Sequence, residues 1–183
     1  MTILAVTITG RDKPGIISAL TGAIFESGGN LEDASMTILE GEFAMILLAC
    51  LKDVSSCVRL CKKLNVLERT MGLTISTREL KRRLIRGHKG AAGTKPWIIS
   101  VSGKDRAGIV YRVSKLLARN RINITDLNSR IIGSGKGAGY ALILEADLPQ
   151  NERLQKRLLG SFKALERTIK MTIILTPLET TDL

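Results

Sequence analysis

The sequence predicts an α+β protein made of two copies of one βαββαβ unit, and two observations lead to this prediction. The first is an internal repeat: the segment GRDKPGII at 10–17 recurs 93 residues later as GKDRAGIV at 103–110. The second is hydrophobic periodicity, because segments with strand-like and helix-like spacing follow the same order in both halves. A repeated element order across 183 residues indicates two related domains in tandem.

The first half begins with a strand at 3–9, where apolar residues alternate with threonines. A helix opening at Pro14 follows, because proline suits the first helical position, and Gly28 and Gly29 end it. The remaining elements are expected as hairpin strands at 30–39 and 43–51, a helix with the apolar stripe Val54, Val58, Cys61 and Leu64, and a strand at 73–77. In the first helix Ile17, Leu20 and Ile24 keep the spacing of a buried face.

The second half repeats this order, with a helix that opens at Ala107 and ends at Asn120. Its later elements are expected as hairpin strands at 123–132 and 139–147, a helix with Leu154, Leu158, Phe162 and Leu165 on one side, and a strand at 171–175. Each unit is therefore predicted to be a ferredoxin-like sandwich: one four-stranded antiparallel sheet with two helices on one face.

The charge distribution divides the chain in the same way. The total is +11, from 28 basic and 17 acidic residues, but residues 1–80 carry 8 basic and 9 acidic residues. Residues 81–95 carry six basic residues and no acidic one, and 96–183 carry 14 and 8. We expect a first domain at 1–80, a basic linker at 81–95 and a second domain at 96–183.

The corner between the first strand and the first helix is the most specific motif. Gly10 and Gly15 allow a tight turn, and Asp12 is placed to cap a free amide of the first helical turn. The amides that follow Gly15, with the positive end of the helix dipole, are suited to a carboxylate or phosphate. A well-capped turn whose glycines serve geometry alone explains one copy equally well, but the recurrence of Gly-x-Asp-x-x-Gly-Ile favours a binding function.

A second polar cluster opens each hairpin. Alternation along 30–39 places Asp33 and Ser35 on one face of the strand and Ala34, Met36 and Ile38 on the core face. The second copy repeats the polar face with Asp126, Asn128 and Arg130. An Asn amide offers both a donor and an acceptor, which suits a zwitterionic amino acid. Asn30 and Asn123 also fit loop caps, and the two Asp residues also fit solvated acids.

These motifs resemble the ACT domain, a family of small regulatory modules that bind amino acids. The resemblance rests on Gly-x-Asp-x-Pro-Gly-Ile after a strand, on Asn-Leu or Asn-Ile some fifteen residues later, and on the βαββαβ order. Within the family, the tandem arrangement and the stretch GGNLED at 28–33 resemble the glycine cleavage system transcriptional repressor group. The resemblance covers nearly the whole chain apart from the linker and the last few residues.

The resemblance implies a ligand held between two ACT domains by the corner and by the Asn that opens the second strand. Carried over by position, the ligand-binding residues are Gly10, Asp12, Gly15, Ile16 and Asn30, with Gly103, Asp105, Gly108, Ile109 and Asn123 in the second copy. Pro14, Asp33 and Asp126 complete the predicted set. The departure is Ala107, which stands where the family has proline and makes the second site the weaker match.

The sequence gives little support for a metal site, for catalysis or for a membrane segment. Cys57 and Cys61 are four residues apart on a helix, but without a third ligand a buried pair is favoured over a metal site. The single histidine, His88, lies in the linker, so no catalytic triad or acid–base pair is apparent and we expect no enzyme activity and no cofactor. Neither a leader nor an apolar run of the ~20 residues that a membrane helix needs is apparent, so we expect a cytoplasmic protein without membrane contact.

We therefore predict a non-enzymatic regulatory protein that binds a small amino acid at the ACT–ACT junction. It signals to a partner protein, for which a transcription regulator of glycine metabolism is a candidate; whether the chain also forms a homodimer stays open. The alternative is a protein that binds polyanions non-specifically through the basic linker and the basic C-terminal half. Base stacking of the kind used by RNA-recognition sheets is not expected, because the central strands offer too few aromatic residues.

Overall fold

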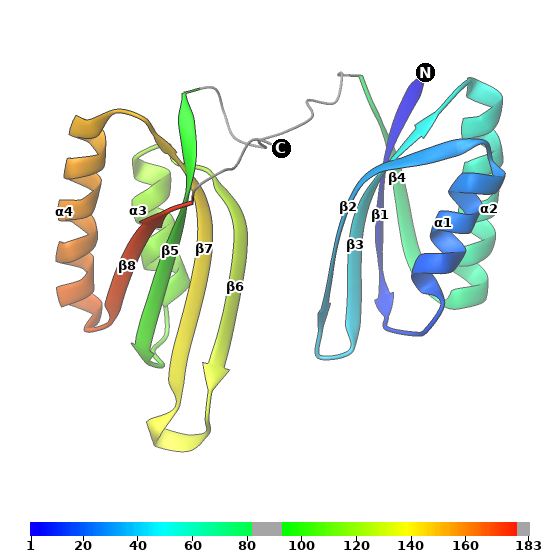
Figure 1. Ribbon diagram of the computed structural model, residues 1–183. Helices are drawn as coiled ribbons and strands as arrows, with labels where there is room; N and C mark the ends of the chain where they lie inside the picture. The colour runs from blue at the N-terminus through cyan, green and yellow to red at the C-terminus, as the bar shows by residue number, and fades with distance from the viewer. Residues whose placement is uncertain (82–92, 179–183) are drawn as a thin grey trace. The chain divides into compact units, whose positions relative to one another are not determined.

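The computed structural model describes residues 1–81 and 93–178, without the side chain of Lys136. The chain divides into two compact units, unit 1 (Met1–Leu84) and unit 2 (Ile85–Leu183). Each is a βαββαβ sandwich, so the predicted α+β fold is confirmed (Figure 1). Strand β5 begins at Thr94, inside the segment predicted as linker; 82–92 lie outside the described residues.

In unit 1 the elements are β1 (Thr2–Arg11), α1 (Ile16–Glu26), β2 (Gly29–Leu39), β3 (Glu42–Leu51), α2 (Val54–Met71) and β4 (Leu73–Leu80). The sheet has the order β2-β3-β1-β4, and all its neighbours are antiparallel. Both helices cover one face of this sheet and leave the other face open (Figure 1).

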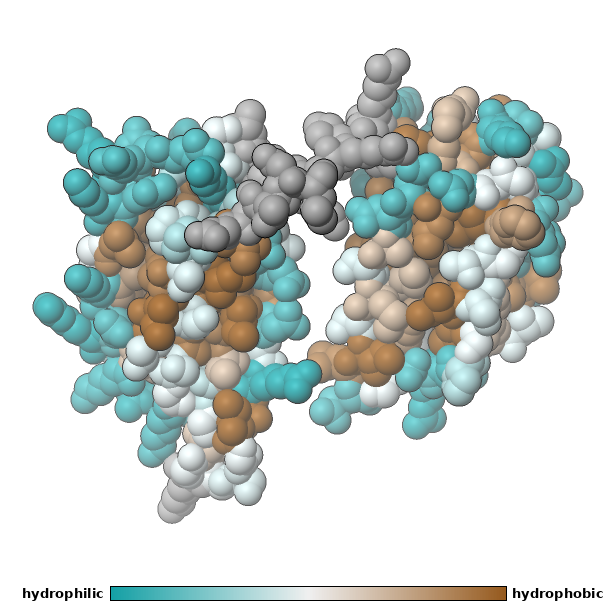
Figure 2. All heavy atoms as spheres, in the orientation of Figure 1, coloured by the Kyte–Doolittle hydropathy of each residue, from teal (hydrophilic) through white to brown (hydrophobic). Residues whose placement is uncertain are grey.

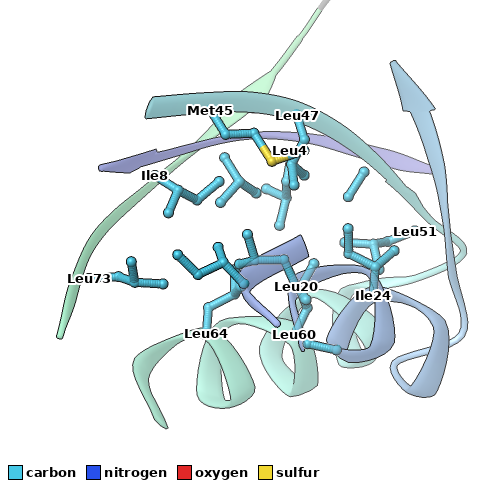
Figure 3. Close-up of a cluster of buried hydrophobic side chains, with 14 of the residues drawn as sticks. Leu4, Ile8, Leu20, Ile24, Met45, Leu47, Leu51, Leu60, Leu64 and Leu73 are labelled. Carbon is cyan, nitrogen blue, oxygen red and sulfur yellow. The ribbon is translucent and has the colours of Figure 1, made fainter. Parts of the chain in front are cut away.

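The core of unit 1 lies between that sheet and its helices. Strand β1 turns Val6 and Ile8 inward, both fully buried, and Leu47 of β3 lies beside Val6 in the sheet register. Leu20 of α1 and Leu60 of α2 close the cluster from the helix side (Figure 3). The threonines that alternate with the apolar residues of β1 lie on the open face.

In unit 2 the elements are β5 (Thr94–Lys104), α3 (Ile109–Arg119), β6 (Ile124–Ile132), a short 3-10 turn η1 (Gly135–Gly137), β7 (Gly139–Pro149), α4 (Glu152–Ile169) and β8 (Thr172–Pro177). The sheet order β6-β7-β5-β8 is the same as in unit 1. Ile99, Leu144, Leu117 and Phe162 are fully buried at the centre of its core, and Trp97 packs partly buried against it.

The prediction for β2 is correct about which side chains share the core side of the sheet, but it is wrong that these side chains are buried. Register places Ala34, Met36 and Ile38 opposite Leu47, Met45 and Phe43, on the side of the sheet that the helices cover. Yet Met36 and Ile38 are 41% and 50% exposed, and Ala34 is also exposed. The reason is that β2 is an edge strand with a neighbour on one side only.

The predicted buried face of α2 is wrong in the first turns of the helix. Val54 and Val58 are 74% and 49% exposed, whereas Ser56 and Leu60 are buried. Ser56 is held inward because its amide binds the capping carboxylate of Asp53. The other exposed members of the predicted stripes are Ile17 on α1 and Leu154 on α4.

Candidate functional site: the strand–helix corners

The corner of unit 1 is formed by the residues between β1 and α1. Helix α1 begins at Ile16, two residues later than predicted, and Gly15 is its N-cap at φ +95°, a backbone conformation that favours glycine. Pro14 therefore precedes the cap instead of opening the helix. The side chain of Ile16 is buried and anchors the first turn in the core.

The first-turn amides of α1 receive no capping side chain within the described residues. The prediction that Asp12 caps this turn is therefore wrong: its own backbone amide instead donates to the carbonyl of Gly41, at 2.8 Å. A β-carbon on Gly15 would meet only the Ser18 hydroxyl, at 4.0 Å, so the space beside the cap is open. Free amides at the positive end of a helix form a surface suited to a small anion.

Contacts on two sides hold this corner in place. On one side the Asp12–Gly41 hydrogen bond joins it to the β2–β3 turn. On the other, Lys13 Nζ donates to the carbonyl of Met71 at the end of α2, at 3.2 Å. Gly10 lies so close to the next strand that a β-carbon would be 2.8 Å from Leu73 Cδ2. The corner is thus rigidly placed although its amides are exposed.

The corner of unit 2 has the same construction. Gly108 is the N-cap of α3 at φ +85°, and Ile109 is buried below it. The amide of Asp105 donates to the carbonyl of Ala138 at 3.1 Å, and Gly103 lies against Met171. Ala107 precedes the N-cap as Pro14 does, so the departure from the family pattern leaves the backbone of the corner unchanged.

Asn30 and Asn123 lie at the opening of β2 and just before β6. Asn30 is exposed, and its Nδ2 donates to Glu32 Oε1 at 3.3 Å. Asn123 is exposed too, and its carbonyl accepts from the amide of Asp147 at 3.0 Å. The two Asn residues thus occupy equivalent positions in the two units.

Within one unit, the structure does not bring the corner and the Asn together. Asn30 lies opposite Cys50, which lies opposite Ile3 at the start of β1, whereas Gly10 is seven residues further along β1. At about 3.3 Å per residue the two parts are ~23 Å apart along the sheet. The predicted site residues of a unit therefore form two clusters, one at each end of its sheet.

Asp33 and Asp126 belong to neither cluster. A bulge in β2 between Leu31 and Asp33 sets Asp33 on the open face of the sheet, and the second copy has the same irregularity before Asp126. Both Asp side chains are exposed, and Asp126 Oδ2 accepts from Asn128 Nδ2 at 2.8 Å. The predicted polar face of these strands is confirmed, whereas their contribution to a ligand site stays a prediction.

Sequence analysis missed an arginine that ties the helices of each unit together. Arg59 of α2 donates to the carbonyl of Ser27 at the end of α1, at 3.2 Å, and to the hydroxyl of Ser56 at 2.8 Å. In unit 2, Arg157 donates to Asn120 Oδ1 at the end of α3, at 3.3 Å. The Arg-Leu pair in both second helices is the signal in the sequence that could have revealed this tie.

Within the described residues, no group of three or more His, Cys, Asp or Glu side chains is placed to hold a metal ion. Cys57 and Cys61 are partly buried against the core of unit 1, in agreement with the prediction that they are a buried pair. Of the helices at 1–81 and 93–178, none is long and apolar enough to span a membrane.

Comparison with known proteins agrees with this geometry. ACT-domain family models match residues 2–78 and residues 97–160, which together take in most of both units. The chain belongs to the ACT-domain family, and the predicted tandem of two such domains is confirmed. It is therefore a member of a family of regulatory modules that bind small molecules.

Among particular relatives, a UPF0237 protein of Neisseria meningitidis serogroup A is 33% identical over 76 residues, which are 42% of this chain and 80% of that protein. A UPF0237 protein of Methanopyrus kandleri is 40% identical over 53 residues, 29% of this chain. The chain spans only 59% of the Methanopyrus protein's length, less than two thirds.

Two crystal structures show the same tandem fold. A protein of unknown function from Galdieria sulphuraria has a TM-score of 0.80 at 23% identity, over 97% of this chain and 99% of its own. A protein provisionally named a glycine cleavage system transcriptional repressor has a TM-score of 0.72 at 18% identity, over 98% of both chains. At these identities the likeness concerns the fold alone.

Proposed function

We propose that this protein is a non-enzymatic regulator that binds a small amino acid and passes its occupancy to a partner protein. The observation that carries the proposal is the pair of equivalent corners, each with a glycine N-cap and first-turn amides that no side chain of the described residues caps. The positive φ of both caps requires glycine, and a glycine cap leaves the first-turn amides open to a ligand. The duplication of this corner supports a binding role.

The chemistry of the two clusters matches the two ends of an amino acid. The amides after Gly15 or Gly108 suit the α-carboxylate, because donors and the helix dipole both favour negative charge there. The side-chain oxygen of Asn30 or Asn123 suits the α-ammonium group as an acceptor. Both classes of contact are duplicated in the chain.

One ACT unit alone cannot supply both contacts to one ligand, since its own corner and Asn are ~23 Å apart along the sheet. We therefore place the ligand at a junction of two ACT units, one giving the corner and the other giving the Asn. Exposed apolar side chains on the open sheet faces support such pairing. Ile46 is 55% exposed and its counterpart Ile143 is 50% exposed, and hydrophobic side chains reach the surface of both units (Figure 2).

The partner in this proposal is a transcription regulator, with glycine metabolism as the regulated process. The support is the name given to one structural neighbour, together with the regulatory character of the family. Ligand binding would change the surface that the partner contacts, and a coupling of ~1–3 kcal/mol between the two binding events is sufficient. The regulatory signal needs no catalytic group.

A thermal-shift panel of the twenty amino acids tests the proposal. A ligand at a hundred times its dissociation constant stabilises the folded state by about 2.7 kcal/mol, which raises Tm by several degrees. We expect one or two small amino acids to stabilise the protein, and Asn30→Ala or Asn123→Ala to weaken that effect at least tenfold in ligand concentration.

The matched control is Asn65→Ala, because Asn65 is exposed on α2 and belongs to neither cluster. It should leave the ligand response unchanged. A panel without any stabilising amino acid would contradict the proposal, and equal responses from all three Asn variants would remove the Asn residues from the site.

A further inference from the structure

The helices of unit 2 carry an excess of positive charge that those of unit 1 lack. Helices α3 and α4 together hold eight basic and two acidic residues, whereas α1 and α2 hold four and two. The two units share one fold and one element order, so unit 1 serves as a comparison for what the fold itself requires. The additional charge of unit 2 is not a requirement of the sandwich.

On α4 the charge is confined to one side of the helix. Successive residues of a helix turn by about 100°, so Arg153, Lys156, Lys163 and Arg167 fall within about 80° of its circumference. All four are exposed. The buried side of α4, marked by Phe162, lies opposite them. This stripe therefore faces straight away from the core.

Small residues accompany the charges of this stripe. Gly160 lies within the same sector and Ala164 lies about 20° outside it; both are exposed, so the basic side chains flank a shallow stretch of helix surface. A β-carbon at Gly160 would have no neighbour within 4 Å. The stripe extends from Arg153 to Arg167, which is ~21 Å at 1.5 Å per residue.

Helix α3 adds to the same layer. It packs beside α4 on one face of the sheet (Figure 1), and its exposed side carries Arg112 and Arg119. At the equivalent positions of α1, 93 residues earlier, stand Ala19 and Glu26. We call Arg112, Arg119, Arg153, Lys156, Lys163 and Arg167 the basic helical face.

Structural ties do not explain this face. In unit 1, Arg59 and Lys63 are bound to Ser27 and to Glu26. In unit 2 the corresponding tie is made by Arg157, which is outside the basic helical face. Within 1–81 and 93–178, none of the six residues of the face takes part in a salt bridge. Their charges are thus available to an external anion.

We infer that the basic helical face is a docking surface for the phosphate backbone of duplex nucleic acid, read without regard to base sequence. Its charge is complementary to a dense row of phosphates, and Arg forms bidentate hydrogen bonds to phosphate. Single strands are disfavoured because their binding relies on several stacked aromatic residues, whereas the α4 stripe has none and α3 exposes one, Tyr111, which Lys115 already contacts. A lipid surface is disfavoured because the stripe holds glycine and alanine where an interfacial helix needs large apolar side chains.

The test uses the full chain and a fluorescent 20-base-pair DNA duplex, with anisotropy measured from 50 to 200 mM NaCl. The unaltered protein should bind, with affinity that falls steeply as salt rises. The triple variant Arg153→Gln, Lys163→Gln, Arg167→Gln should bind at least tenfold more weakly at 50 mM NaCl. The slope of log affinity against log salt should fall by about 2.7, since each lost phosphate contact contributes about 0.9.

The matched control removes the same charge from unit 1 with Lys52→Gln, Lys62→Gln and Arg69→Gln, all at exposed positions. It should change the affinity less than threefold. The inference is overturned if the unaltered protein does not bind the duplex at 50 mM NaCl, or if both triple variants lose affinity equally.

Two further arms separate the inference from its alternatives. If Arg82→Gln, Arg83→Gln, Arg86→Gln abolishes binding while the α4 variant binds normally, the contact belongs to the linker and the inference is wrong. The same holds if phosphatidylserine vesicles, but not the duplex, depend on the α4 stripe. Circular dichroism should show an unchanged fold, and the amino-acid thermal shift of the α4 variant should match that of the unaltered protein.

Discussion

The carboxylate of Glu68 on α2 accepts a hydrogen bond from the backbone amide of Ile75 on β4, with Oε1 at 2.9 Å from the nitrogen. Unit 2 repeats this contact between Glu166 and Ile173, also at 2.9 Å. Because β4 and β8 are edge strands, a side chain here satisfies a strand amide that has no sheet neighbour.

Loss of this carboxylate should destabilise the unit that contains it. We expect Glu68→Ala or Glu166→Ala to lower the free energy of unfolding by about 1–2 kcal/mol, since a charge-assisted hydrogen bond is lost. Urea unfolding followed by circular dichroism measures the change. Glu68→Gln should retain most of the stability, and Glu79→Ala, at an exposed position of β4, is the control.

Acid sensitivity should depend on the N-cap of α2. Asp53 accepts from the amide of Ser56 at 2.7 Å and from the hydroxyl of Ser55 at 2.8 Å, and these bonds lower its pKa from 3.8 to about 2. The lowered pKa stabilises the fold above pH ~4, and this contribution is lost as pH falls towards 2.

The cap of α4 supplies the matched variant, because Asn151 accepts from the amide of Leu154 there without a titrating group. Asp53→Asn should therefore show a smaller loss of stability than the unaltered protein between pH 5 and pH 2, measured by urea unfolding at each pH. Parallel stability curves for the two proteins would contradict this account.

The two corner glycines should differ in their tolerance of a methyl group. At Gly10 the new β-carbon would lie 2.8 Å from Leu73 Cδ2 and 3.2 Å from the carbonyl oxygen of Gly72, so the backbone itself must shift. At Gly103 the nearest atom is Met171 Cγ, at 3.1 Å, and a methionine side chain adapts. We expect Gly10→Ala to cost about 1–3 kcal/mol and Gly103→Ala to cost less.

Thermal unfolding checks this order, with Gly22→Ala as the control. Gly22 lies inside α1 with no neighbour within 4 Å of the added carbon. That substitution should stabilise the protein by about 0.5–1 kcal/mol, because alanine is the better helix former. Equal losses at Gly10 and Gly103 would show that the backbone contact at Gly10 is not decisive.

The phenol of Tyr111 should ionise at a lower pH than a free tyrosine side chain. Lys115 Nζ donates to its hydroxyl oxygen at 2.9 Å, and this bond, together with the positive charge, lowers the pKa of Tyr111. Absorbance at 295 nm follows this ionisation. Lys115→Gln should raise that pKa, whereas Lys163→Gln should leave it unchanged.

The element order of both units was predictable because the same pattern occurs twice, so each half of the sequence supports the assignment made for the other half. Burial was less predictable at sheet edges and at helix starts. Alternation identifies the side of a strand that faces the helices, but Ile38 shows that it does not reveal whether anything covers that side. Val54 and Val58 were predicted on the buried stripe of α2, but the polar Ser56 is buried instead, with its amide bonded to Asp53 and its hydroxyl to Arg59.

The sequence predicted the glycines of the candidate site but not the distance between the corner and the Asn. The glycines at the caps followed from their pattern, and the structure has them at positive φ. The ~23 Å between corner and Asn depends on which end of the sheet each residue reaches, and strand register sets that distance. The ties made by Arg59 and Arg157 depend on contacts 32 and 37 residues apart in sequence, which local patterns do not contain.

Within the described residues, every strand of each sheet comes from one half of the chain, and this has a thermodynamic consequence. Because each hydrogen-bonded ladder is complete in its own half, we expect two cooperative unfolding transitions, and the Tm of each half is to be read separately. The chain's only tryptophan, Trp97, packs against the core of unit 2. Its fluorescence therefore follows the melting of that half alone, while circular dichroism records both.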